Sequence, residues 1–199
     1  MFIPNIDDYQ VILASQSPRR HYLLKEIGLD FEIKGKGFVD ESYPQELKAE
    51  EIPLYISKKK ASVFEDLKEH EILITADTIV WFDEQVLQKP MDKEDAIQML
   101  KQLSGKRHQV FTGVCIKSKD KEFAFTSQTD VYFKKLTYAE IDYYINHFQP
   151  MDKAGAYGIQ EWIGYIGVIK IDGSFFNVMG LPIQKLYTEL DNFINDHLE

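Results

Sequence analysis

An acidic residue, Asp77, interrupts an apolar stretch of the sequence. Residues 72–74 and 79–82 on either side are mostly β-branched or aromatic, a composition typical of buried strands. Asp77 either caps a turn between two strands or pairs with a lysine, or it serves as a general base or metal ligand at the end of a core strand, where ligands of α/β folds bind. Lys89 precedes Pro90 and is therefore predicted to be extended, which makes Asp77 and Lys89 candidates for one cleft.

Two consecutive arginines follow a predicted strand over residues 11–14. Ser17 is a natural N-cap and Pro18 a natural first residue for a helix, so Arg19 and Arg20 fall at its positively polarised end. The positive charges of the two arginines are repelled by the positive end of the helix dipole. A bound anion such as phosphate would relieve this repulsion and would find free backbone N–H groups there. A solvated helix start is the alternative interpretation.

Paired acids end the loop that follows a short predicted strand at residues 31–33. Asp40 and Glu41 are either solvated or bound to a hard divalent cation, which prefers carboxylate oxygens. The loop pattern by itself leaves both interpretations open.

One lysine of a basic run breaks the pattern of a helix predicted to begin near Pro53. Lys60 lies four residues from both Ile56 and Phe64, on the apolar face, whereas Lys59 points elsewhere. An ammonium on the buried side of a helix needs an anionic partner, so Lys60 is expected to be paired. The apolar face of this helix comprises Ile56, Val63, Phe64 and Leu67.

The second half of the chain combines strands with capped helices. Helices are predicted to begin after Asp92, and after Thr137 in a capping box. Strands are predicted over residues 108–116 and 123–133. His108 opens the first of them, either as a catalytic base or, more ordinarily, as a polar residue that is hydrogen-bonded in place.

Residues 149–160 combine an acid, a base, two glycines and an amide. Asp152 and Lys153 can simply pair with each other in a loop. The glycines nevertheless permit close backbone approach, and Gln160 offers the donor and acceptor needed to recognise the edge of a base. A second glycine-rich segment, residues 172–182, is predicted to form turns before an amphipathic C-terminal helix.

Composition limits the class of protein. The chain has 199 residues, 44% of them hydrophobic, which supplies a globular core, and no linker or repeat marks a domain boundary. A formal net charge of −9 argues against binding a nucleic acid polymer over a broad surface, but allows a small anion in a local basic cleft. No apolar run approaches the roughly 18 to 20 residues of a membrane helix, and the single Cys115 excludes an intramolecular disulfide. A soluble, cytoplasmic protein that binds no membrane is therefore expected.

Six motifs follow one another along the chain: SQSPRR, ADTIV, QKP, GKRHQVFTG, DKAGAYGIQ and GSFFNVMGLP. In this order they resemble the Maf family of nucleoside triphosphate pyrophosphatases. The GAYGIQ segment is similar to the branch that hydrolyses dTTP and UTP, rather than to the branch that acts on 7-methyl-GTP. Two positions depart from the family pattern, since Gln149 stands where an acid is common and Glu161 where glycine is usual.

The resemblance implies an α/β protein with the Maf/Ham1-like (ITPase-like) fold, a central mixed sheet with two α/β lobes around a cleft. Residues 1–199 would form a single Maf-like domain with the active site between these lobes, usually as a homodimer. The implied reaction is attack of water on the α-phosphorus of dTTP or UTP, which yields the monophosphate and pyrophosphate. Mg²⁺ or Mn²⁺ is the implied cofactor.

The resemblance also implies residue roles. Asp77 matches the family's proton acceptor. The positions that select pyrimidines are Arg19, Thr78 and Gln160. The positions associated with phosphates are Ser15, Arg20, Lys60 and Lys89. Phosphoryl transfer needs both cations and carboxylates, and Glu41 and Asp77 can hold the metal. Whether Asp77 is the base, a metal ligand or both stays open.

Two other functions stay open alongside this one. One is a pyrophosphatase of the same fold that acts on another modified or purine nucleotide. The other is a nucleotide-binding regulator of cell division, in which hydrolysis would be incidental. The sequence also does not specify whether the physiological substrate is a standard or a modified pyrimidine nucleotide.

Overall fold

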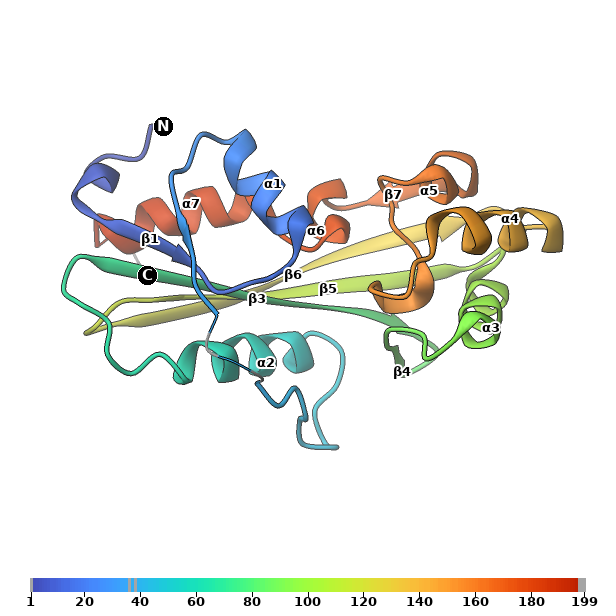
Figure 1. Cartoon of the computed structure of the whole chain (residues 1–199), viewed down its shortest axis with the longest axis horizontal. Helices are drawn as coiled ribbons and strands as arrows, with labels where there is room; N and C mark the ends of the chain where they lie inside the picture. The colour runs from blue at the N-terminus through green and yellow to red at the C-terminus, as the bar shows by residue number, and fades with distance from the viewer. Residues whose placement is uncertain (1, 36, 38, 197–199) are drawn as a thin grey trace. The chain divides into compact units, whose positions relative to one another are not determined.

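The structure, a computed structural model, describes residues 2–35, 37 and 39–196 (Figure 1). In this part of the chain no helix is long and apolar enough to cross a bilayer. The strands are β1 (Gln10–Leu13), β2 (Glu32–Ile33), β3 (Glu71–Phe82), β4 (Gln85–Leu87), β5 (Arg107–Lys117), β6 (Glu122–Phe133) and β7 (Val168–Asp172). The α-helices are α1 (Pro18–Glu26), α2 (Glu51–Ser62), α3 (Lys93–Leu103), α4 (Tyr138–Phe148), α5 (Trp162–Gly167), α6 (Phe175–Met179) and α7 (Ile183–Ile194). Two short 3₁₀ helices are η1 (Ile6–Asp8) and η2 (Ala154–Ala156).

The strands form a mixed sheet in the order β2-β1-β3-β5-β6-β7, with β4 paired to β3. β1 runs parallel to both of its neighbours, and Val11 lies opposite Ile72 of β3. β4 and β7 run antiparallel to β3 and β6. The mixed sheet predicted for the fold class is therefore confirmed.

β3 differs from the sequence prediction. Two strands with Asp77 at a turn between them are expected from the apolar pattern, but one strand runs from Glu71 to Phe82 and contains Asp77. The side chains of Thr75 and Asp77 are hydrogen-bonded to α2, so polar residues enter the strand without leaving unsatisfied buried groups. The prediction of a turn was wrong because these partners lie far away in the sequence.

The chain divides into two compact units. The first unit comprises Met1–Asp77, Thr112–Ser127 and Gly180–Glu199, and the second comprises Thr78–Phe111 and Gln128–Met179. In the first unit, α2 covers one face of the strands, while α1 and α7 lie on the other (Figure 1). α7 buries the apolar face predicted for the C-terminal helix, which comprises Leu186, Leu190, Phe193 and Ile194.

α2 ends earlier than the sequence predicts. The helix stops at Ser62 instead of continuing to Leu67. Lys117 Nζ donates hydrogen bonds to the carbonyl oxygens of Ala61 at 3.3 Å and Phe64 at 3.0 Å, which stabilises this early end. Phe64 and Leu67 therefore enter the core from an irregular segment rather than from the helix.

In the second unit, α4 packs against both α3 and α5. Asp92 caps α3, because its carboxylate accepts a hydrogen bond from the backbone N–H of Asp95 at 2.8 Å. Thr137 and Glu140 form both hydrogen bonds of the capping box at the start of α4. The predicted caps of both helices are thus confirmed.

His108 is buried in the second unit. Its Nε2 lies 2.7 Å from the Tyr157 hydroxyl, and the rings of Phe133 and Tyr157 pack against it edge-on. Burial lowers the pKa of His108 to about 3. The neutral, enclosed ring favours the interpretation of His108 as a polar strand residue hydrogen-bonded in place.

Acidification is expected to destabilise the wild type more steeply than a His108→Gln variant. In the unfolded chain a histidine takes up a proton below about pH 6.5, whereas in the folded protein His108 stays neutral down to a pKa of about 3. The unfolded state binds more protons between these values, so the free energy of unfolding falls as the pH falls, by up to about 1.4 kcal/mol per pH unit. Urea unfolding from about pH 4 to about pH 7 measures the two slopes. His70→Gln, at an exposed position, is the control, and equal slopes for wild type and His108→Gln would contradict this prediction.

Candidate active site

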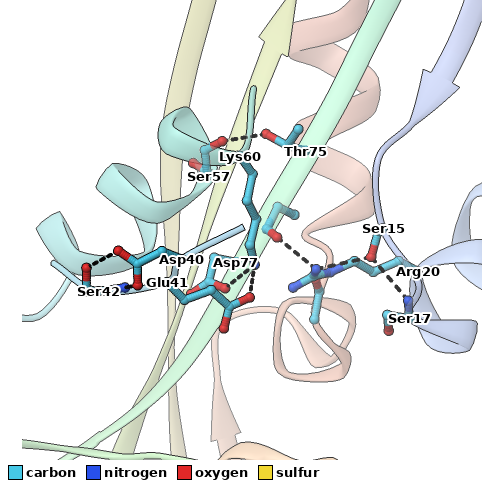
Figure 2. Close-up of polar contacts among 12 residues, drawn as sticks. Ser15, Ser17, Arg20, Asp40, Glu41, Ser42, Ser57, Lys60, Thr75 and Asp77 are labelled. Atoms are coloured by element: carbon cyan, nitrogen blue, oxygen red, sulfur yellow. Dashed lines mark hydrogen bonds and ion pairs between the residues drawn. The ribbon is translucent and has the colours of Figure 1, made fainter. Parts of the chain in front are cut away.

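β3 and α2 contact each other through two polar contacts, one to a backbone carbonyl and one between side chains. Thr75 and Asp77 are two residues apart on the strand and share one face, while the residues they contact, Ser57 and Lys60, lie one turn apart on the helix. Thr75 Oγ1 donates to the Ser57 carbonyl oxygen at 2.7 Å, and Lys60 Nζ donates to Asp77 Oδ1 at 2.7 Å (Figure 2). The periods of the strand and the helix therefore fix Lys60 opposite Asp77.

The Lys60 ammonium lies between two carboxylates. Besides its contact with Asp77, Nζ is 2.8 Å from Glu41 Oε1 (Figure 2). The side chains of Lys60 and Asp77 are only 16% and 12% exposed, whereas that of Glu41 lies nearer to solvent. The anionic partner expected for Lys60 is thus present twice, and three residues from separate segments meet at one cation.

The loop that carries Glu41 is held by the neighbouring lysine of α2. Lys59 Nζ donates to Asp40 Oδ2 at 3.0 Å and to the Ser42 carbonyl oxygen at 2.9 Å. Hydrogen bonds from the Ser42 hydroxyl and backbone N–H, and then from Lys59, lower the pKa of Asp40 to about 2. Lys59 and Lys60 therefore hold Asp40 and Glu41 respectively. Sequence reasoning missed the role of Lys59. The only signal for it was that two adjacent lysines, Lys59 and Lys60, match two adjacent acids, Asp40 and Glu41.

Arg20 connects α1 to the backbone beside Asp77. Its Nε donates to the Gly180 carbonyl oxygen at 2.7 Å, and Nη1 donates to the Ala76 carbonyl oxygen at 2.8 Å and to Ser15 Oγ at 3.3 Å. Burial lowers the pKa of Arg20, and the nearby carboxylate of Asp77 opposes this shift. Arg20 thus holds the β3 backbone immediately before Asp77.

The start of α1 differs in detail from the prediction. Ser17 occupies the N-cap position and Pro18 is the first helical residue, as expected, but the Ser17 side chain makes no capping hydrogen bond. Ser15 Oγ instead accepts a hydrogen bond from the backbone N–H of Ser17 at 3.2 Å (Figure 2). Arg19 follows, half-buried, and its charge adds to the lowering of the Arg20 pKa.

The remaining candidate residues belong to the second unit. Thr78 is half-buried on β3, and Lys89 is exposed between β4 and α3. Gln160 is half-buried in the turn before α5, and its Oε1 atom is buried without a hydrogen-bond partner. Asp152 and Lys153 do pair, at 2.7 Å. The shared action of these residues with those of the first unit on one substrate stays a prediction.

The side chains that suit a divalent cation are the two carboxylates already paired with Lys60. No group of three or more His, Cys, Asp or Glu side chains that could hold a metal occurs within residues 2–35, 37 and 39–196. Glu41 and Asp77 nevertheless face one positive charge, and Mg²⁺ is commonly held by one or two protein carboxylates together with substrate phosphates. The residues present therefore fit such an ion.

Known proteins resemble this chain in fold and in sequence. The solved structure of a HAM1 protein from Coxiella burnetii has a TM-score of 0.50 and 12% identity, and the match covers 92% of this chain and 98% of that chain. It supports the predicted Ham1-like fold class. Two proteins named dTTP/UTP pyrophosphatase, from Bacteroides thetaiotaomicron and Bacteroides fragilis, are 57% and 54% identical, cover 94% of this chain, and are covered over 97% and 98% of their own lengths.

A family model also matches most of this chain. The family model described as "Maf: Maf-like protein" matches residues 10–193. That range contains Asp77 and the residues grouped around Lys60, and it includes every motif on which the resemblance rests. The chain therefore belongs to the Maf family.

Proposed function

We propose that this protein is a nucleoside triphosphate pyrophosphatase that hydrolyses dTTP and UTP to the monophosphate and pyrophosphate. The observation that carries the proposal is the buried Asp77 carboxylate, which lies 2.7 Å from the Lys60 ammonium on a strand where Thr75 is also hydrogen-bonded to α2. The names of the relatives, which match this chain over nearly their whole lengths, supply the nucleotides.

In the proposed reaction, a bond forms between a water oxygen and the α-phosphorus while the bond from that phosphorus to the bridging oxygen breaks. Asp77 accepts the proton of the water, and pyrophosphate leaves. The cations Lys60 and Lys89, with the Ser15 hydroxyl, neutralise or bind phosphate oxygens, which is the main source of catalysis in phosphoryl transfer. Arg20 contributes by holding the backbone at Ala76, next to the base.

We assign Glu41 and Asp77 as the residues that would hold Mg²⁺ or Mn²⁺. Such an ion supplies neutralisation of phosphate charge and lowers the pKa of water when it is bound. The Lys60 ammonium occupies the position between the same two carboxylates, at 2.8 Å and 2.7 Å, so positive charge is favoured there. Asp77 is assigned as the base, as a metal ligand, or as both, and its replacement is expected to impair the reaction in each case.

The chain's only cysteine does not take part in the proposed chemistry. Cys115 is completely buried, and burial raises its pKa to about 12, so the thiol is not a nucleophile at neutral pH. A cytoplasmic location, a homodimer, and an active site in a cleft between two lobes of one domain all stay predictions.

UTP and dTTP are expected to exceed CTP as substrates by about tenfold or more in kcat/KM, since an unpaired buried polar group costs about 1–3 kcal/mol. Uracil and thymine present an N–H donor between two carbonyl groups, and the buried Gln160 Oε1 has no partner in the protein, which suits that donor. Cytosine has an acceptor in the same place. Gln160→Ala is expected to remove most of this preference.

The test measures phosphate release from UTP, dTTP, CTP and GTP with inorganic pyrophosphatase added. Gln102→Ala, at an exposed position on α3 of the same unit, is the matched control. Equal rates on UTP and CTP in the wild type, or an unaltered preference in Gln160→Ala, would exclude Gln160 from base selection and favour a broader substrate range. Tight binding without turnover would instead favour a regulatory nucleotide-binding protein.

A further inference from the structure

A buried polar network holds the segment that contains Gln160. Tyr144 on α4 donates a hydrogen bond from its hydroxyl to Glu161 Oε2 and accepts one from the backbone N–H of Gly158 at 3.0 Å. The other carboxylate oxygen of Glu161 lies 3.1 Å from Lys153 Nζ. Gln160 therefore lies in the segment from Gly158 to Glu161, whose two ends are joined through the Tyr144 hydroxyl.

The members of this network are enclosed enough to depend on one another. Tyr144 is completely buried, and the side chains of Lys153 and Glu161 are 10% and 20% exposed. A buried charge without a partner is costly, so Lys153 and Glu161 stabilise each other's position. Burial, followed by the hydrogen bond to Glu161, raises the pKa of Tyr144, so its hydroxyl stays a donor at neutral pH.

The carboxylate of Glu161 also packs directly on the backbone of the turn. A Cβ atom at Gly158 would lie 2.7 Å from Glu161 Cδ and 2.9 Å from its Oε2, so only glycine allows this approach. The backbone N–H of Glu161 donates to the Gly158 carbonyl oxygen at 3.0 Å. The turn from 158 to 161 is thus closed once by its backbone and a second time by the Glu161 side chain.

We infer that Glu161 is a positioning residue for base selection, which acts by holding the turn that carries Gln160. The inference rests on the proposed function. Gln160 Oε1 is buried without a partner, an arrangement that costs free energy until a ligand donor arrives. Such an atom selects a base only if the backbone keeps it at one place, and Glu161 supplies that restraint through Tyr144 and Lys153.

The experiment combines Glu161→Ala with Gln160→Ala in a double-mutant cycle. Glu161→Ala is expected to lower the UTP to CTP ratio of kcat/KM by about fivefold, mainly through a higher KM for UTP, with kcat changed by less than about twofold. In the Gln160→Ala background the same replacement should leave the ratio unchanged. Tyr144→Phe should reproduce the loss, and Glu161→Gln, which keeps an acceptor for Tyr144, should restore part of the ratio.

Thr137→Ala is the matched control, because it removes the capping box of α4, the helix that carries Tyr144, without touching the network. It should lower Tm and leave the ratio unchanged. An unchanged ratio in both Glu161→Ala and Tyr144→Phe would overturn the inference, as would an equal loss in the Gln160→Ala background. If Glu161→Ala does not fold, Glu161→Gln and Tyr144→Phe decide. Absence of UTP hydrolysis in the wild type would overturn the proposed function instead.

Discussion

Asp77→Asn is expected to fold normally and to hydrolyse UTP about 10²- to 10⁴-fold more slowly than the wild type, the range for loss of a positioned acid–base group. Asparagine keeps the size of the side chain and can still accept a hydrogen bond from Lys60. It cannot accept a proton from water, and it binds a cation far more weakly than a carboxylate does. The loss is therefore expected in kcat, with little change in secondary structure.

Phosphate release with added pyrophosphatase measures the Asp77→Asn rate, and thermal unfolding confirms that the variant is folded. Asp130→Asn is the matched control, since the Asp130 side chain is 14% exposed, close to the 12% of Asp77, and is also paired with a cation, Arg107. It should keep nearly full activity. A folded Asp77→Asn variant with more than about a tenth of wild-type turnover would show that Asp77 is not catalytic.

Lys60→Met is expected to lower kcat/KM for UTP by about 10²-fold, the typical effect of removing one preorganised charge at a reacting phosphate. The replacement also leaves Glu41 and Asp77 facing each other without the ammonium between them. Both carboxylates lie within 2.8 Å of the same ammonium, and like charges so close to one point repel each other, so Tm should fall as well. The combined loss of activity and stability distinguishes this site from an ordinary surface lysine.

Lys58→Met provides the control for Lys60→Met. Lys58 lies two residues away on α2 and has the same charge, but it is exposed and its partner Glu122 lies 3.5 Å away, so its removal should change kcat/KM by less than about threefold. Comparable losses in the two variants would attribute the effect to the charge of the helix rather than to the contact with Asp77. A large fall in Tm of Lys60→Met with unchanged kinetics would make Lys60 a structural ion-pair residue.

Much of the fold was predictable because it depends on neighbours in the sequence. Asp92 and the capping box at Thr137 start α3 and α4 as expected, since a cap requires only side chains within one turn of the helix. The apolar periods also predicted most strands and the buried face of α7. Boundaries were wrong where a distant residue intervened, as Lys117 does at the end of α2.

For the candidate site, the sequence indicated a local requirement but not the arrangement of the residues. The apolar face of α2 correctly indicated that Lys60 needs an anionic partner, because helical periodicity is a local property. Its two partners, Glu41 and Asp77, could not be deduced from spacing, since neither belongs to the same helix as Lys60. The roles of Lys59, Tyr144 and Glu161 were missed for the same reason.

The sequence by itself determined most of the strands, the caps of α3 and α4, the motifs that identify the Maf family, and the residue types available for phosphate chemistry. The tertiary structure alone decided that β3 continues through Asp77, that Lys60 lies between two carboxylates, and that Glu161 closes the turn beside Gln160. The physical reason is that each of these features joins side chains from different segments. Such contacts form only when a helix packs on the sheet or on a loop, and their energy depends on burial and distance that no local pattern specifies.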